Sequence, residues 1–434
     1  MGEIELALFY LFLGAFLLWG ASVTAPDTIS SLRFSTLGTW RLPAQLTFLT
    51  GGILSLAAGI FRVVAPSLFR TGRPGRISRW SPAKTSLLRG ISAVGIVFLV
   101  LVWAGMGRQI DVIGMMTQSL RLATPIALGA LAGLLCERSG VINIAIEGMM
   151  LTAACIGFTL ALYTQNIWVG LLAAVLVGSL TAALHAILSI RFVVDQIISG
   201  TVINILAVGI TGFIRQAFLL NNPLGAPSVF PTWQVPVLSE IPVIGQIFFR
   251  HQPMVYTMLV LVPALHILIF YTRWGLRTRA VGEHPHAADT LGINVFKIRY
   301  TNVIASGLIA GFAGAWFSLE TVGNFNDVMT GGKGFIALAA MIFGKWNPLG
   351  AFGGALLFGF ADALQIKLQI SGVRVPYQFL GMVPYLITMI VLAGLIGRAI
   401  PPAADGIPFV KDRAGAPDQP PRPPSLAQPL LRRR

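Results

Sequence analysis

Charged residues are scarce in this sequence. They make up 11% of its 434 residues, whereas 55% of the residues are hydrophobic and the mean hydropathy is +0.77. A soluble domain carries roughly 25% charged residues. The low charge therefore excludes an ordinary soluble domain and predicts a polytopic membrane protein.

Acidic residues are the scarcer charge class, with 16 Asp and Glu against 31 Lys and Arg, so the formal net charge is +15. In a soluble chain this imbalance would suggest nucleic-acid binding. Here the basic residues fall mostly in loops and in the C-terminal tail, where they orient helices and meet anionic lipid headgroups. We therefore expect membrane lipid, and no nucleic acid, among the partners.

Catalytic and metal-binding motifs are missing. The GGKGF run at 331–335 has neither the spacing nor the Ser or Thr of a GxxxxGK[ST] phosphate loop, and HExxH and GxSxG do not occur. The two cysteines, Cys136 and Cys155, lie in or beside apolar runs without metal-ligand spacing. We therefore expect no internal ATPase, no hydrolase and no metal site, so a partner or an ion gradient must supply any energy.

Apolar runs of about 20 residues, the length that spans a bilayer, recur along the chain. We expect spans near 5–23, 44–65, 87–105, 118–136, 145–164, 167–190, 196–220, 253–272, 300–321, 334–346, 349–369 and 377–397. The run at 334–346 is short and suits a half-span. The N-terminus lacks the positive segment and cleavage site of a signal peptide, so its run is expected to remain as a span. The expected fold is all-α, a polytopic integral membrane helical bundle of about 12 spans (10–12) with broken or short helices in its core.

The distribution of basic residues predicts the topology and the domains. Loop 66–86 carries Arg70, Arg73, Arg76, Arg79 and Lys84, which places it in the cytoplasm together with 273–300 and the tail. An even number of spans with both termini cytoplasmic satisfies these regions and leaves the Pro-rich loop 221–252 outside. We expect added transmembrane helices and a basic cytoplasmic linker over 1–116, a main core over 117–400, and a disordered Pro-rich basic tail over 401–434, with order ending near Val410.

Polar residues interrupt the apolar run at 137–151, ERSGVINIAIEGMML. Asn143 lies where a helix could break, and Glu147 follows about one turn later. Broken helices occur at membrane depth where they line a cavity or are buried in protein. The alternative is a cytoplasmic turn in which Glu137 and Arg138 are solvated and Glu147 caps a helix.

Two further polar groups lie in later runs. Gln196, Gly200 and Asn204 recur every four residues and so share one helix face, which could line a pore or hold helices together. Asp362 is either a pathway residue or a buried interhelical partner.

The stretch 273–300, RWGLRTRAVGEHPHAADTLGINVFKIRY, is a polar loop between two apolar runs. Pro285 is suited to starting a short amphipathic helix over 286–291, which Gly292 ends. Such a helix could dock a soluble partner. The alternative is a solvated loop that only fixes the topology.

Four motifs stand in order along the chain: SGVINIAIEGMML (139–151), RFVVDQIISGTVINILAVGIT (191–211), GLRTRAVGEHPHAADTLGIN (275–294) and GFIALAAMIFGKWNPLGAFGGALLFGFADALQ (334–365). They resemble the permease subunits of bacterial ABC importers for nucleosides and simple sugars, a family that also includes ribose-type and branched-chain amino acid permeases. The resemblance covers about 117–400, and EGMM, VDQIISG and FGKWNPLG are closer to the nucleoside branch. The N-terminal extension departs from the shortest members.

The resemblance implies a multi-pass permease of the bacterial plasma (inner) membrane for uptake of purine or pyrimidine nucleosides. It is not an enzyme and holds no cofactor, because ATP and Mg are bound by partner ATPase subunits. A second permease chain, identical or not, completes the pathway, and an extracytoplasmic binding lipoprotein delivers the solute. ATPase coupling would fall to Gly282, Glu283, Pro285, Ala287, Ala288 and Gly292, and the substrate pathway to Asn143, Glu147, Gln196, Asn204 and Asp362.

Other functions fit parts of the sequence. Within the importer interpretation, a simple sugar such as ribose or a branched-chain amino acid is the alternative solute. An ion-coupled secondary transporter would need charged groups near the middle of the membrane, for which Glu147 and Asp362 are candidates. A structural membrane scaffold is a third alternative, which the large polar loop disfavours.

Overall fold

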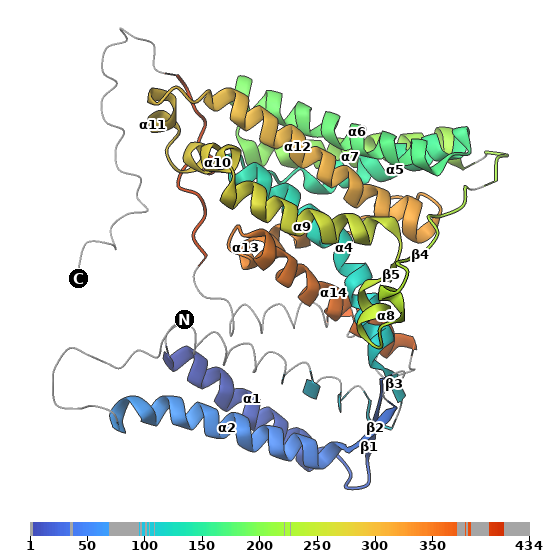
Figure 1. Ribbon diagram of the computed structural model, residues 1–434, viewed down its shortest axis with the longest axis vertical. Helices are drawn as coiled ribbons and strands as arrows, with labels where there is room; N and C mark the ends of the chain where they lie inside the picture. The colour runs from blue at the N-terminus through green and yellow to red at the C-terminus, as the bar shows by residue number, and fades with distance from the viewer. Residues whose placement is uncertain are drawn as a thin grey trace.

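The computed structural model describes residues 3–34, 38–68, 95, 98–99, 102–103, 105–107, 109–220, 222–225, 227–370, 378, 381–382 and 399–411. In these residues the chain is mostly helical, as expected. Long helices run side by side, and two small β-sheets lie at the end of the bundle away from α10 (Arg273–Glu283) and α11 (Pro285–Thr290) (Figure 1).

The N-terminal part is a helical hairpin joined to a small sheet. Helices α1 (Glu3–Val23) and α2 (Ala44–Leu68) are linked through the antiparallel strands β1 (Ile29–Arg33) and β2 (Thr39–Pro43). Strand β3 (Gln109–Asp111) pairs in parallel with β1 and leads directly into α4 (Val112–Glu137). A separate apolar cluster, which includes Leu17, Leu32 and Phe360, fixes this part to the outer end of the core.

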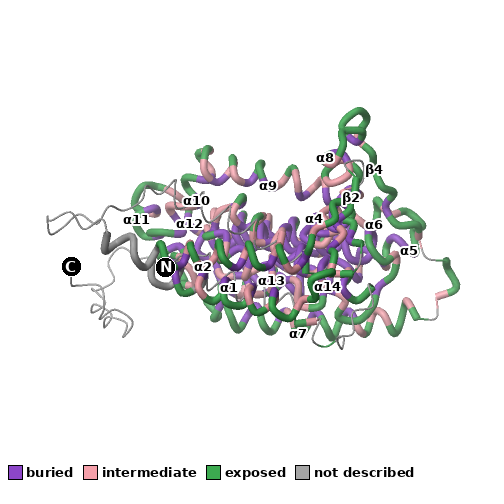
Figure 2. The backbone as a smooth tube through the Cα atoms, turned by 90° about the horizontal axis from the view of Figure 1, so that it is seen from below, coloured by how far each residue is buried: buried purple, intermediate pink, exposed green. Residues whose placement is uncertain are grey.

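Helix α4 is the centre of the bundle. It is buried along most of its length, and Figure 2 shows the buried residues gathered around it while the peripheral helices are exposed. Three helices follow α4 before the loop at 221–252. They are α5 (Ile146–Thr164), α6 (Ile167–Ala186) with its π-helical extension η2 (Ile187–Arg191), and α7 (Gln196–Ile214) with its extension η3 (Arg215–Leu219). Most residues of α4 are buried against other helices on every side, as is typical of a helix at the centre of a bundle.

The second half of the core begins after the loop at 221–252, which holds β4 (Trp233–Gln234), η4 (Leu238–Glu240), α8 (Ile244–Phe248) and β5 (Arg250–His251). It continues with α9 (Pro253–Tyr271), α10, α11, α12 (Val295–Ala315) with its extension η5 (Trp316–Val322), α13 (Lys333–Phe343) and α14 (Pro348–Ile370). A short helix thus starts at Pro285, and Gly292 follows it at φ +80°, as the sequence indicates.

Eight helices in the described residues are long and apolar enough to cross a membrane, by length and composition: Ala44–Phe61, Val112–Glu137, Ile146–Thr164, Ile167–Arg191, Gln196–Leu219, Pro253–Tyr271, Val295–Val322 and Pro348–Ile370. All eight coincide with expected spans, and α13 is a short apolar helix, as its run indicates. The expected spans 87–105 and 377–397 and the bases of loop 66–86 lie largely outside the described residues. The total of about twelve spans therefore stays a prediction.

The beginning of the expected disordered tail is packed against protein. Residues 399–411 lie along α10, where the Ala404 N–H donates to the Gly282 carbonyl at 2.9 Å. Phe409 is buried in a cluster with Val281, Ala288 and Val295. Residues 401–411 thus pack against α10 and α12, whereas 412–434 lie outside the described residues, so the disorder expected beyond Val410 stays a prediction.

Helices α6 and α12 touch backbone to backbone. A Cβ added at Gly307 would lie 2.4 Å from both the Ala182 Cβ and the Gly178 carbonyl oxygen. Small residues at such crossings let helices approach closely enough for van der Waals packing to hold them together in lipid. This crossing therefore requires glycine at 307.

We expect Gly307→Ala to destabilise the fold by about 1–3 kcal/mol, because its methyl group has no space. The matched control is Gly209→Ala on α7, where an added Cβ meets nothing within 4 Å and replacing a helical glycine should stabilise by about 0.5–1 kcal/mol. Thermal unfolding in detergent can be followed with a thiol-reactive dye, because Cys136 and Cys155 are both free and buried. Equal melting temperatures for the two variants would contradict the tight crossing.

Candidate functional site

The chain leaves helical geometry inside the bundle between α4 and α5. Residues 139–145 form this break, in which Val141, Asn143 and Ala145 are fully buried. Gly140 has φ +83°, and a Cβ there would lie 2.9 Å from Arg299 Nη2. A buried non-helical backbone at membrane depth needs hydrogen-bond partners from neighbouring elements.

Asn204 of α7 supplies two of these partners. Its Nδ2 donates to the Ile144 carbonyl at 3.0 Å, and its Oδ1 accepts from the Gly148 N–H at 2.8 Å. One amide thus satisfies a carbonyl of the break and an N–H in the first turn of α5, which the helix itself cannot satisfy. Asn204 fixes the start of α5 against α7.

Gln196 and His185 hold the middle of the break. The Ile142 N–H donates to Gln196 Oε1 at 2.7 Å, and the Ile142 carbonyl lies 2.9 Å from His185 Nε2. The other ring nitrogen of His185 is 3.1 Å from Ser199 Oγ. Sequence reasoning missed His185, although a single titratable residue inside an apolar run was the available signal.

The Asn143 side chain is buried inside the bundle, next to α12. Its Nδ2 is 3.4 Å from Ser306 Oγ on α12 and 3.7 Å from Met149 Sδ. Its Oδ1 is buried and has no hydrogen-bond partner within the described part of the chain. Asn143 therefore keeps one unused acceptor in the middle of the bundle.

Glu147 of α5 binds the start of the half-length helix α13. Its Oε1 accepts from the Thr330 hydroxyl at 2.6 Å and from the Gly332 N–H at 2.8 Å, and its Oε2 accepts from the Gly334 N–H at 2.6 Å. A carboxylate at a helix N-terminus is stabilised by the unpaired N–H groups and by the helix dipole. Glu147 thus caps α13, a helix more than 180 residues away in sequence.

Asp362 of α14 reaches the same point through an ion pair. It contacts the ammonium group of Lys333, the first residue of α13, and both side chains are mostly buried. Glu147 and Asp362, predicted separately, therefore meet at the start of one short helix. Thr330 and Lys333 are functional residues that the sequence alone does not single out, because their partners Glu147 and Asp362 are distant along the chain.

The contacts of Glu137 and Arg138 test the two alternatives for residues 137–151. Glu137 is buried and accepts from Trp346 Nε1 at 2.6 Å, so the alternative with a solvated Glu137 is wrong. Arg138 donates from Nε and Nη2 to the Trp346 carbonyl at 2.9 and 2.8 Å, and partial burial lowers its pKa. The solute-contact role of the five candidate pathway residues stays a prediction.

The six candidate coupling residues lie on α10, on α11 and in the turn after it. Gly282, Pro285 and Ala288 are buried, and a Cβ at Gly282 would lie 2.3 Å from the Arg138 carbonyl oxygen. Glu283, Ala287 and Gly292 are exposed, together with Leu291, which is 81% exposed and was not singled out. The motif therefore has an inward side that packs on the start of the break and an exposed outward side, on which Glu283 accepts a hydrogen bond from the Ala403 N–H of the tail.

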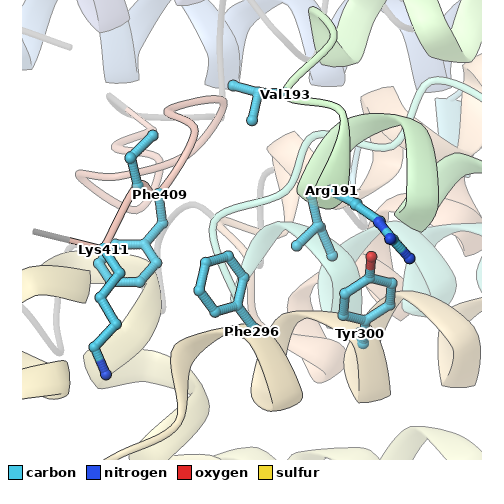
Figure 3. Close-up of a pocket in the computed structure, with 8 residues that line it drawn as sticks. Arg191, Val193, Phe296, Tyr300, Phe409 and Lys411 are labelled. Atoms are coloured by element: carbon cyan, nitrogen blue, oxygen red, sulfur yellow. The ribbon is translucent and has the colours of Figure 1, made fainter. Parts of the chain in front are cut away.

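A cavity of about 640 Å³ opens beside this end of the bundle. Figure 3 shows Phe296 and Tyr300 from α12 along the bottom of the view, Arg191 beside Tyr300, Val193 at the top, and the tail residues Phe409 and Lys411 on the far side of Phe296 from Tyr300. Among the described residues no group of three or more His, Cys, Asp or Glu side chains could hold a metal ion.

Residues 115–396 match the family described as branched-chain amino acid transport system / permease component. The chain is 41% identical over 301 residues to the nucleoside ABC transporter permease protein NupC of Lactococcus lactis subsp. cremoris, covering 67% of this chain and 95% of that protein. It is also 41% identical over 310 residues to the guanosine ABC transporter permease protein NupQ of Bacillus subtilis, covering 68% and 96%.

A third relative is TsgC13 of Haloferax volcanii, an ABC transporter permease protein whose name gives glucose as its provisional solute. It is 36% identical over 307 residues, covering 66% of this chain and 92% of that protein. No solved structure matches the chain.

We expect Asn204→Leu to destabilise the protein by about 1–3 kcal/mol, because it leaves the Ile144 carbonyl and the Gly148 N–H buried without a partner. Thr201→Ala on the same helix is the control, since the Thr201 hydroxyl is exposed and bonds only to its own helix. Thermal unfolding compares the two variants, and equal stability would show that the amide does not support the break.

We expect Glu147→Gln to destabilise the start of α13 by about 1–2 kcal/mol, because a neutral amide keeps one acceptor oxygen for three donors. Hydrogen exchange of the peptide that contains 330–336 measures this effect. The exposed acid Glu240, changed to Gln, is the control. Unchanged protection of 330–336 in Glu147→Gln would contradict the capping role.

Proposed function

The chain belongs to the permease-component family of branched-chain amino acid transport systems, and from this membership we propose that it is the transmembrane permease subunit of an ATP-driven ABC importer for nucleosides. The observation that carries the solute class is the 41% identity to two permeases named for nucleosides and guanosine, over 95% and 96% of their lengths. The relative with glucose as its provisional solute is 36% identical, which makes a simple sugar the second candidate.

The proposed complex contains cytoplasmic ATPase subunits, a second permease chain and an extracytoplasmic binding lipoprotein. ATP and Mg are bound by the ATPase subunits. The protein is multi-pass, in the bacterial plasma membrane in contact with lipid, with both termini cytoplasmic. Support for this orientation comes from the bases of 273–300, on the side of the bundle that carries α10 and α11.

We propose the division into added helices over 1–116, a permease core over 117–400 and a basic tail over 401–434. The family match begins at residue 115, next to the first boundary, and ends at 396, next to the second. The separate apolar cluster of the N-terminal hairpin also supports the first boundary. The added helices are thus proposed to be an extension fixed to a complete permease.

We propose that Asn143, Glu147, Gln196, Asn204 and Asp362 shape the solute pathway. Their contacts hold two non-helical segments in the bundle interior, the break at 139–145 and the approach to α13. Transporters place solute sites where helices are interrupted, because unwound backbone and helix ends offer polar groups there. The unused Oδ1 of Asn143 is the free acceptor of this set for a ribose hydroxyl.

The geometry of α10 suggests how ATP hydrolysis reaches this site. The ATPase would contact the outward side, Glu283, Ala287 and Gly292, while Gly282, Pro285 and Ala288 anchor the helices to the core. Gly282 packs on the backbone of Arg138, which leads into the break and from there into α5. A rigid displacement of α10 would therefore move the break and the Glu147 end of α5.

The direct test is uptake of labelled guanosine, glucose and leucine into vesicles that contain the permease with its ATPase and lipoprotein. ATP-dependent guanosine uptake is expected, with little uptake of leucine. Uptake of glucose but not guanosine would favour the sugar function. Guanosine uptake without an ATPase that collapses with an ionophore would overturn the proposal in favour of an ion-coupled transporter.

We expect Ala287→Glu to weaken ATPase binding about tenfold or more, which corresponds to about 1.4 kcal/mol, because it places a charge in the small-residue contact of α11. Binding of the purified ATPase to permease nanodiscs measures this effect. Ser228→Glu, which adds the same charge at an exposed position of the loop at 221–252, is the control. Equal affinities for both variants would exclude α11 from the contact.

A further inference from the structure

The tail residues 399–411 form an ordered segment across the coupling end. In Figure 1 this segment runs in red beside α10 towards α11. Its backbone is bound to α10 twice, because the Ala404 N–H donates to the Gly282 carbonyl at 2.9 Å and the Ala403 N–H donates to Glu283 Oε2 at 3.2 Å. Two of the six candidate coupling residues are therefore held by the tail.

The same segment is bound to α12 and α11. Arg299 Nη1 of α12 donates to the Ile407 carbonyl at 3.0 Å, and the Phe409 ring lies 5.0 Å from His286 and 5.3 Å from Phe296. Figure 3 shows Phe409 facing Phe296. Lys411 Nζ is 3.6 Å from Asp289 Oδ1. The segment thus ties three helices together.

One contact reaches into the core. The Asp405 carboxyl group interacts with the Glu137 carboxyl group at the end of α4, and its Oδ1 is buried without a hydrogen-bond partner among the described residues. Because Glu137 also accepts from Trp346 Nε1, it is fixed in place from the other side. A hydrogen bond between two carboxyl groups requires a proton on one of them, since two carboxylates in contact repel each other.

Four other charged or titratable groups surround this pair. Arg299 of α12 and Cys136 of α4 interact electrostatically with Asp405, and Glu283 of α10 binds the neighbouring Ala403. Arg138 follows Glu137 and donates to the Trp346 carbonyl. Arg299 is the cation that acts on Asp405; its Nη1 donates to the Ile407 carbonyl, and its Nε and Nη2 are buried without a hydrogen-bond partner among the described residues.

We propose that residues 399–411 are a strap that positions the coupling helices α10 and α11 on the permease core, latched by the protonated carboxyl pair of Glu137 and Asp405. The inference rests on the proposed function for the role of α10 and α11 in ATPase docking, but the strap and its latch are properties of this chain alone. Asp405 is a positioning residue, because it acts through α10 and contacts no solute.

The latch makes strap binding depend on cytoplasmic pH. Burial raises the pKa of Asp405 to about 7, whereas a released strap would have an ordinary aspartate with a pKa near 4. Binding of the strap therefore takes up a proton between about pH 4 and pH 7. The bound state is favoured at low pH, weakens by up to about tenfold per pH unit as the pH rises through this window, and levels off above it.

The first experiment measures hydrogen exchange of the Ala404 amide in the full-length permease in nanodiscs at pH 5.5, 6.5 and 7.5, corrected for the intrinsic exchange rate. The protection factor is expected to fall at least tenfold from pH 5.5 to 7.5. In Asp405→Asn, whose amide donates to Glu137 without titrating, the protection factor should not change with pH. The control Glu240→Gln, at an exposed acid far from the strap, should behave as the unaltered chain.

The outcomes test the strap and the latch separately. An unprotected Ala404 amide at every pH would overturn the strap, and the same pH dependence in Asp405→Asn as in the unaltered chain would overturn the latch. Both readings are independent of transport. A failed uptake experiment would therefore remove the proposed function without changing them.

A second measurement tests the positioning role. In vesicles with the ATPase side held at pH 6.5 or 7.5, the number of solute molecules transported per ATP should be higher at pH 6.5 for the unaltered chain and equal at both values for Asp405→Asn. Phe409→Ala, which removes the ring contacts but leaves the carboxyl pair, should lower the ratio at both values. A ratio that responds to pH equally in the unaltered chain and in Asp405→Asn would contradict the positioning role.

Discussion

A buried backbone group without a hydrogen-bond partner is the constraint on which this bundle depends. A membrane interior offers no water to satisfy such groups, so a break in a helix is stable only if neighbouring side chains supply the missing partners. The break between α4 and α5 is stabilised in this way by Gln196, His185 and Asn204. The start of α13 receives the same support from Glu147. The polar residues of the core are thus explained first by the geometry of the chain, and the proposed pathway uses the non-helical segments that they hold in place.

This dependence also connects the two ends of the proposed mechanism. Arg138 and Glu137 lie where α10, the tail and the break meet, and both are fixed by Trp346. Helix α10 therefore rests on the same few residues from which the break begins. A change in how firmly α10 is held is transmitted to the break through packed backbone, because dense protein interiors deform little and shift as units. The carboxyl pair at this junction is the point at which protonation can alter that support.

The faces away from the core have a different chemistry. Large apolar side chains such as Ile205 and Phe213 of α7 are strongly exposed on the single chain, which suits a face that lipid covers. The glycines of α6 and α12 face each other instead, so these helices pack without side chains between them. The chain thus buries the glycine-lined faces of α6 and α12 by itself, whereas it leaves the large apolar face of α7 for the membrane to cover.

By itself, the sequence determined the class of the protein, the positions of eight spans, the short helix α13 and the break at 139–145. These features depend on local hydropathy, on helix-breaking residues and on motif order, all of which are written along the chain. The tertiary structure decided what the polar residues contact. That Glu147 caps α13, that Asp362 pairs with Lys333, and that Asp405 in an apparently featureless tail meets Glu137 could not be deduced, because these partners are distant in sequence. Periodicity shows which face of a helix is polar, but only the packing of the helices decides which distant group that face meets.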